Sequence, residues 1–116
     1  MLYIGRYVDQ KGLVLLWEAF LSLTHENPMS ELHCVGTGEK FDARLKHEKV
    51  FHHGFLQPAE LEPLILDATA FVIPSLFEPW GVVLHEMAAA GLPLITSDAV
   101  GAATTFVSEG VNGWSY

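Results

Sequence analysis

Phe77-Glu78-Pro79-Trp80-Gly81-Val82-Val83-Leu84-His85-Glu86-Met87-Ala88-Ala89-Ala90-Gly91, residues 77–91, is a loop that leads into a helix. Pro79 disfavours a helical backbone at Glu78 and so leaves that acid in the loop. Good helix formers fill residues 82–90, and Gly91 ends the helix. Apolar runs of strand type flank this unit, over residues 70–74 before it and 92–96 after it. Strand, loop, helix and strand in this order form the crossover that builds parallel sheets.

The amino end of this helix is a candidate anion site, because it lies beside the carboxyl end of a strand. Free backbone N–H groups and the positive end of the helix dipole converge there. Glu78 in the loop and Glu86 in the second helical turn bracket that end. Carboxylates repel phosphate, so we interpret these acids as acceptors for hydroxyl groups of a ribose or a sugar. From Gly81 to Glu86 the helix rises ~7 Å, roughly the step from a bound phosphate to its ribose.

Strand and helix signals alternate along the rest of the chain. Further strands are predicted over residues 1–4, 31–35 and 50–53, and further helices over 12–24, 39–47, 58–67 and 102–108, with a turn at 110–113. This alternation predicts an α/β fold, a Rossmann-like parallel sheet with helices on both faces. Because no linker or repeat interrupts the pattern, residues 1–116 are predicted to form a single domain.

The composition excludes several classes of protein. A formal charge of −8 with only six Lys and Arg argues against binding to nucleic acid. No apolar run is long enough to span a bilayer, and the chain does not begin with a signal-peptide pattern. The lone Cys34 fits a reduced, cytoplasmic setting. None of the six histidines has the spacing of a metal-binding motif, so we predict no metal site.

Two basic residues follow the first predicted strand. Arg6 and Lys11 lie in one loop, where they either clamp a diphosphate or remain solvated cations. Gly36-Thr37-Gly38 is too short for a phosphate-loop motif, so we interpret Gly36 as part of a tight turn that forms a secondary wall of the site. Trp80 either covers a ligand or pins its own loop.

Residues 74–93 resemble the Glu-x7-Glu signature of retaining glycosyltransferases, with Glu78 and Glu86 as its two acids. Residues 5–12 resemble the Gly-Arg…Lys-Gly loop of the same family, and shorter matches fall at 35–38, 53–55 and 109–113. These enzymes have the GT-B architecture of two Rossmann-like domains. The chain is therefore similar to the C-terminal, donor-binding half of a group 1 (family 4) glycosyltransferase.

The resemblance implies catalytic roles for three residues. Arg6 and Lys11 would bind the diphosphate of a nucleotide-sugar donor and stabilise the departing charge, so that no metal and no cofactor is needed. Glu78 would hold the donor sugar during front-side transfer with retention. Glu86 would accept hydrogen bonds from the ribose.

The same resemblance implies contacts from the surrounding loops. The loop amides near Trp80, Gly81 and Val82 would hold the donor sugar. The loop that contains Gly54 and Phe55 would border the nucleobase.

Family members carry a further N-terminal domain that binds the acceptor, and this chain has no counterpart of it. We therefore expect a fragment that is inactive or nearly so alone. The full-length enzyme is expected in the cytoplasm, with any peripheral association with the inner face of the membrane made through that absent domain. Residues 101–105 also depart from the family, which often has an acid and a proline there.

Two alternatives remain beside polysaccharide, lipopolysaccharide or glycoconjugate synthesis. One is a nucleotide-sugar 2-epimerase of the same architecture, which would act on its donor without an acceptor. The other is a non-catalytic nucleotide-binding or response-regulator-like module. A response regulator needs clustered aspartates after its first strands, and Gly5 and Arg6 stand at that place.

Overall fold

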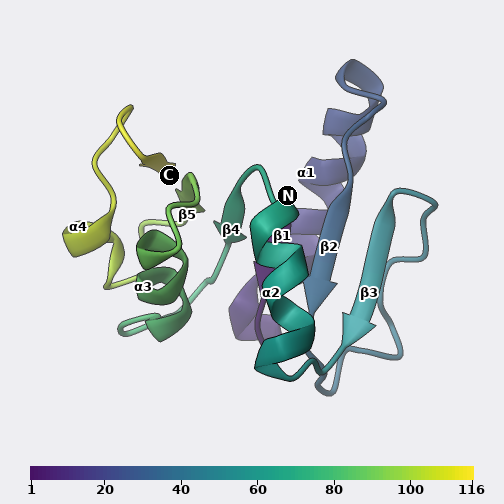
Figure 1. Cartoon of the computed structure of the whole chain (residues 1–116). Helices are drawn as coiled ribbons and strands as arrows, with labels where there is room; N and C mark the ends of the chain where they lie inside the picture. The colour runs from purple at the N-terminus through teal and green to yellow at the C-terminus, as the bar shows by residue number, and fades with distance from the viewer.

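The computed structural model describes residues 1–116 and contains one six-stranded sheet whose neighbouring strands are all parallel (Figure 1). Its strands are β1 (Leu2–Ile4), β2 (Leu32–Val35), β3 (Val50–Gly54), β4 (Phe71–Ile73), β5 (Leu94–Thr96) and β6 (Gly113–Ser115). Its helices are the 3₁₀ turn η1 (Asp9–Lys11), α1 (Leu13–Glu26), α2 (Pro58–Asp67), α3 (Val82–Ala89) and α4 (Ala103–Phe106). The predicted Rossmann-like α/β fold is confirmed.

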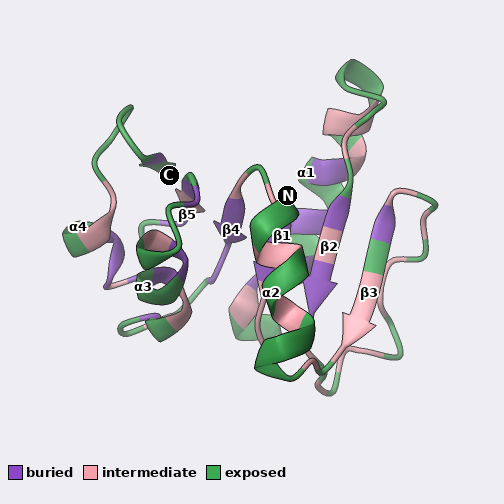
Figure 2. Cartoon of the chain, in the orientation of Figure 1, coloured by how far each residue is buried: buried purple, intermediate pink, exposed green.

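The two faces of the sheet are covered by different helices, as predicted. Alternate strand residues point to opposite faces, so that Tyr3 packs with α1 whereas Leu2 packs with α3 and α4. Helix α1 buries Leu16, Trp17 and Phe20 against one face, and α2 packs on the other with partly buried side chains. Figure 2 shows β4 and most of β2 as buried, whereas the edge strand β3 is mostly exposed or intermediate. None of the helices combines the length and the apolarity needed to cross a bilayer.

The predicted elements that carry the candidate site are confirmed. Helix α2 has the predicted bounds, because Pro58 suits a first turn and the Gln57 amide donates to the Glu60 carboxylate at 3.1 Å. Helix α3 begins at Val82, directly after Gly81, and ends one residue earlier than predicted.

The predicted helix over residues 39–47 is wrong. This segment forms turns, in which the amide of Phe41 donates to Gly38 at 3.0 Å and that of Ala43 to Lys40 at 3.1 Å. Phe41 and Leu45 still pack against the α1 side of the core. Their four-residue spacing therefore places both side chains against the core without a helical backbone.

The carboxyl-terminal part also differs from the prediction. Helix α4 stops at Phe106, because the Ser108 amide donates to the Asn112 side chain at 2.7 Å and the backbone turns away. Strand β6 was not predicted, since it is only three residues long and has no apolar run. It pairs closely with β5: a Cβ at Gly113 would lie 2.1 Å from the Leu94 carbonyl oxygen.

The strand order β3-β2-β1-β4-β5-β6 determines where a ligand can enter the fold. From β1 the chain crosses by α1 to β2 on one side, and from β4 it crosses by α3 to β5 on the other side. The connections therefore diverge at the carboxyl ends of the neighbouring strands β1 and β4. A divergence of this kind is where doubly wound sheets bind ligands.

Candidate functional site

The loops after β1 and β4 are joined into one rigid unit at this divergence. The Gln10 carbonyl accepts hydrogen bonds from the amides of Leu76 at 2.8 Å and Phe77 at 3.3 Å. Gly12 has a φ of 68°, and a Cβ there would lie 2.1 Å from the Pro74 carbonyl oxygen. Only glycine permits both this backbone conformation and this close approach.

The segment directly after β2, residues 36–38, supports the β1 loop from its other side. The Tyr7 amide donates to the Thr37 carbonyl at 2.9 Å. A Cβ at Gly36 would lie 1.9 Å from the Gly5 carbonyl oxygen. The tight turn predicted over residues 36–38 is wrong, because the chain turns only from residue 39 onward. The close approach predicted at Gly36 is made by the chain's own β1 loop.

The β4 loop is anchored to the segment before α4. The amide of Gly101 donates to the Glu78 carbonyl at 3.0 Å, and the amide of Ala102 donates to the Trp80 carbonyl at 2.7 Å. Gly81 has a φ of 94° and places the first amides of α3 beside these loops. The Leu84 amide donates to the Gly81 carbonyl at 3.0 Å, whereas the amides of Val82 and Val83 have no backbone partner and are available to an anion.

These elements enclose a cavity of about 460 Å³. Its lining includes six of the ten predicted site residues, namely Arg6, Lys11, Glu78, Gly81, Val82 and Glu86, together with Tyr3, Ile4, Gly5, Ile73 and Val83. The cavity therefore brings together the two cations, the two carboxylates and the amino end of α3.

The charged groups of this cavity are not equivalent. The Lys11 ammonium forms an ion pair with the Glu78 carboxylate, and their side chains are only 26% and 15% exposed. Arg6 and Glu86 are exposed and form no ion pair within the chain. One cation is therefore already neutralised inside the cavity, whereas the other is available to a ligand.

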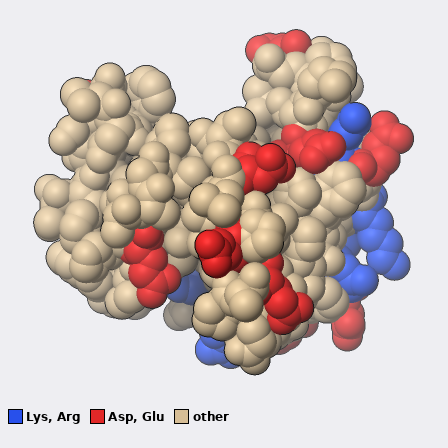
Figure 3. All heavy atoms as spheres, in the orientation of Figure 1, with Lys and Arg blue, Asp and Glu red and all other residues tan.

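Most of the positive charge of the molecule lies elsewhere. Lys40, Arg44, Lys46 and Lys49 belong to the segment between β2 and β3. In Figure 3 the blue groups lie mainly on the side where β3 lies, red groups lie in the middle of the face and along that same side, and the rest of the face is mostly uncharged. Both of the remaining basic residues line the cavity, which makes it a local exception in an acidic chain.

Four predicted site residues do not line the cavity. Trp80 packs edge-on against Phe106, with 6.2 Å between ring centroids, and so attaches its loop to α4. Gly36 contacts the β1 loop, as described above. Gly54 and Phe55 lie at the end of β3, where no atom comes within 4 Å of a Cβ built on Gly54 and where Phe55 is 71% exposed.

Tyr3 is a residue of the cavity that the sequence interpretation missed. It is fully buried in β1, and its hydroxyl donates to the Arg6 carbonyl at 2.9 Å. Burial raises the pKa of the Tyr3 phenol, and the nearby Cys34 and Glu78 raise it further. Its place in a short apolar strand is typical of a core aromatic residue, so no pattern in the sequence pointed to it.

Four of the six histidines, His33, His47, His52 and His53, form side-chain hydrogen bonds, and the histidines form no metal cluster. His52 forms a hydrogen bond with the Tyr7 hydroxyl at 2.7 Å through Nδ1, and its Nε2 donates to the Leu45 carbonyl at 2.7 Å. His53 bonds His33 at 2.9 Å. No group of three His, Cys, Asp or Glu side chains lies close enough to hold a metal ion.

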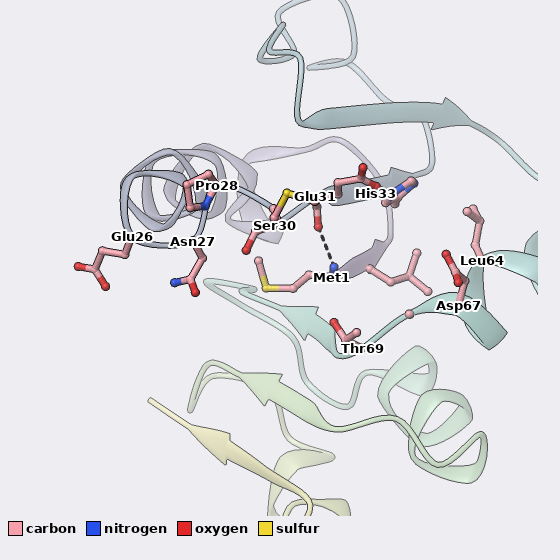
Figure 4. Close-up of a pocket in the computed structure, with 13 residues that line it drawn as sticks. Met1, Glu26, Asn27, Pro28, Ser30, Glu31, His33, Leu64, Asp67 and Thr69 are labelled. Atoms are coloured by element: carbon pink, nitrogen blue, oxygen red, sulfur yellow. Dashed lines mark hydrogen bonds and ion pairs between the residues drawn. The ribbon is translucent and has the colours of Figure 1, made fainter.

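A second hollow, of about 540 Å³, lies at the opposite edge of the sheet (Figure 4). Its charged groups are mainly the acids Glu26, Glu31 and Asp67, and the ammonium group of Met1 donates to the Glu31 carbonyl at 2.8 Å. A third and largely apolar hollow, of about 640 Å³, lies between α1 and β5. Neither hollow contains a Lys or Arg, so neither provides the charge that a phosphate needs.

Comparison with known proteins gives consistent matches. A family model described as Glycosyl transferases group 1 matches residues 1–116. An uncharacterized glycosyltransferase of Methanocaldococcus jannaschii is 34% identical over 125 residues, which cover 100% of this chain and 31% of that protein. Glycogen synthase of Mycobacterium tuberculosis is 36% identical over 108 residues, which cover 87% of this chain and 26% of the synthase.

Solved structures of sugar-handling proteins superpose on nearly the whole chain. Anabaena HepE in complex with UDP and glucose has a TM-score of 0.81 at 25% identity, over 99% of this chain and 33% of HepE. The apo form of the lipopolysaccharide outer core galactosyltransferase WaaB has a TM-score of 0.78 at 26% identity, over 99% of this chain and 34% of WaaB. The chain thus spans about a third or less of the proteins that it matches.

Proposed function

The chain belongs to the glycosyl transferases group 1 family, and from that premise we propose that it binds the nucleotide-sugar donor of a retaining glycosyltransferase. The observation that carries this proposal is the cavity at the carboxyl ends of β1 and β4. It combines Arg6, Lys11 and the amino end of α3 with the carboxylates of Glu78 and Glu86.

The cationic part of the cavity suits a diphosphate. The Arg6 guanidinium offers several hydrogen-bond donors in one plane. The Lys11 ammonium group is compact and can exchange its contact with Glu78 for one with a phosphate oxygen. The first amides of α3 supply further donors. Because the loops that carry these groups are fixed to each other, the backbone would need little reorganisation, and the main change would be the movement of the Lys11 side chain from Glu78 to the diphosphate.

The carboxylates suit the hydroxyl groups of the same ligand. Glu86 lies on α3 beyond the amides, is exposed, and is free to accept hydrogen bonds from a ribose. Glu78 is mostly buried against Lys11 and would accept hydrogen bonds from the sugar once Lys11 turns to the diphosphate. The loop at Gly54 and Phe55 would border the base from outside the cavity.

We propose a uridine diphosphate sugar as the donor class, since the similar HepE was solved with UDP and glucose. In the transfer, the bond between the anomeric carbon and the diphosphate oxygen breaks, and its electron pair stays on that oxygen. The acceptor oxygen bonds to the same face of the sugar, and its proton passes to the departing phosphate. Arg6 and Lys11 would stabilise the negative charge that develops, which is the role a metal has in other transferases.

The acceptor is proposed to bind a further domain of the full-length enzyme. The chain spans 31% of its M. jannaschii relative, so that most of that relative has no counterpart here. We therefore expect the 116-residue chain to bind a donor but to transfer sugar slowly or not at all. Any contact with a membrane would also be made by that further domain.

Calorimetric titration of the chain with UDP, UDP-glucose, GDP-mannose and ADP-glucose tests the proposal. Preferential binding of UDP-glucose is expected, with at least about tenfold weaker binding in Arg6→Ala and Glu86→Ala. Lys46→Ala is the matched control, because it removes an exposed positive charge outside the cavity. No binding of any nucleotide, or equal loss in Arg6→Ala and Lys46→Ala, would refute the proposal.

A further inference from the structure

We propose that Tyr3 is a positioning residue for Arg6, and that its hydroxyl thereby controls how tightly the cavity holds a diphosphate. This inference rests on the proposed function, since it concerns the same site. It assigns a role in ligand binding to a core residue that would not itself carry the charge.

The Arg6 backbone is held in place by a hydrogen bond from Tyr3. The Tyr3 hydroxyl donates to the Arg6 carbonyl at 2.9 Å, and no other hydrogen bond to the Arg6 backbone is present. The neighbouring residues are held differently: the Gly5 amide donates to Val35, and the Tyr7 amide donates to Thr37, both at 2.9 Å. Arg6 therefore has a single point of attachment between two well-anchored neighbours.

The shape of the loop fits around the Tyr3 hydroxyl. A Cβ at Gly5 would lie only 2.6 Å from the Tyr3 hydroxyl oxygen, so that this oxygen fills the space beside the glycine. The Tyr3 ring is held edge-on against Tyr7, with 6.4 Å between centroids and 73° between planes. A rigid and fully buried ring thus presents its hydroxyl at a fixed position under the loop.

The chemistry of the hydroxyl suits this role at neutral pH. Burial raises the pKa of Tyr3, so the phenol keeps its proton and remains a donor. The side chain of Arg6 makes no hydrogen bond or ion pair in the chain. The backbone that the Tyr3 hydroxyl holds therefore fixes only the point from which this side chain extends beside the cavity.

Removal of the hydroxyl should loosen Arg6 and weaken the binding of an anion without unfolding the chain. Tyr3→Phe keeps the ring, and the lost hydrogen bond predicts about fivefold weaker binding of UDP. Tyr7→Phe is a matched control, because it also removes a buried hydroxyl, one that bonds His52 at 2.7 Å and not the loop. Tyr7→Phe should leave UDP affinity unchanged.

The test is a double-mutant cycle with UDP as the probe, in Tyr3→Phe, Arg6→Ala and the double variant, supported by amide hydrogen exchange of residues 5–8. If Tyr3 acts through Arg6, Tyr3→Phe has no further effect on UDP affinity in the Arg6→Ala background. Exchange at residues 5–8 should also increase in Tyr3→Phe and not in Tyr7→Phe.

Full additivity in the cycle, or equal losses of affinity in Tyr3→Phe and Tyr7→Phe, would overturn the inference while leaving the proposed function intact. Absence of UDP binding by the wild-type chain would instead overturn the proposed function, and the role of Tyr3 with it.

Discussion

Gly12 offers the sharpest test of how the loops of the cavity are joined. In Gly12→Ala, an L residue must adopt a φ of 68°, which costs about 1 kcal/mol. The new Cβ would also lie 2.1 Å from the Pro74 carbonyl oxygen, so the β1 and β4 loops must separate by about 1.3 Å to reach an ordinary contact distance. We expect a total loss of about 3 kcal/mol in the free energy of unfolding.

The separation of the loops should also impair the cavity. The two hydrogen bonds that the Gln10 carbonyl accepts from residues 76 and 77 would lengthen, and Lys11 would move relative to Glu78. UDP affinity should therefore fall together with stability. Urea denaturation measures the first loss, and a fall in the melting temperature of about 12 °C is expected, at about 4 °C for each kcal/mol.

Gly54→Ala separates the cost of the backbone conformation from the cost of the contact with Pro74. Gly54 has the same φ of 68°, but nothing lies within 4 Å of a Cβ built there. This variant should lose only the conformational cost of about 1 kcal/mol. Equal destabilisation of Gly12→Ala and Gly54→Ala would show that the contact with Pro74 is unimportant, and would refute the account of the rigid loop pair.

Three further predictions concern titratable groups. Burial raises the pKa of Cys34 to about 11, so the native thiol should react with a disulfide reagent at pH 8 at least about a hundredfold more slowly than in denaturant; rapid native reaction would contradict its burial. Burial lowers the pKa of His52 and also of His53, where His33 adds to the effect. As the pH falls below about 6.5, the unfolded chain therefore binds protons before the folded chain does, and the free energy of unfolding should decrease from pH 7 to pH 5. The decrease should be smaller in His53→Gln. Denaturation at several pH values measures the decrease, and a free energy of unfolding that stays constant over this range would contradict the prediction. Glu78→Gln removes the acid that holds Lys11, so UDP should bind several-fold more tightly by calorimetry, whereas weaker binding would show that the ion pair supports the anion site.

Much of the fold could be predicted because its signals are local. Each strand except β3 and β6 is a largely apolar run followed by small or polar residues, and α3 begins directly after the glycine that the sequence indicates. Since the carboxyl ends of parallel strands share one edge, Arg6, Lys11 and Glu78 were expected at the same edge, and they line one cavity. Local pattern and sheet geometry together were sufficient for this part of the site.

The remainder depends on contacts between distant residues. The ion pair of Lys11 with Glu78 joins positions 67 apart, and no periodicity reports it. The glycines at 12 and 36 each accommodate a carbonyl oxygen from another loop, so their requirement is visible only after the strands are ordered. Residues 39–47 show the opposite case, since their apolar spacing resembles a helix while the backbone forms turns against the β1 loop.

The charge pattern of the cavity has a consequence for ligand choice that does not depend on the family. Two cations and two carboxylates line it, so its formal charge is balanced when no ligand is bound. A ligand that carries only a diphosphate would separate Lys11 from Glu78 and leave a mostly buried carboxylate without a partner, which is costly. A ligand that joins a diphosphate to hydroxyl groups supplies new partners for the cations and for both acids. The site should therefore bind UDP-glucose more tightly than UDP, and UDP more tightly than inorganic pyrophosphate. Tightest binding of pyrophosphate in a competition titration would show that Glu78 and Glu86 do not act as hydroxyl acceptors.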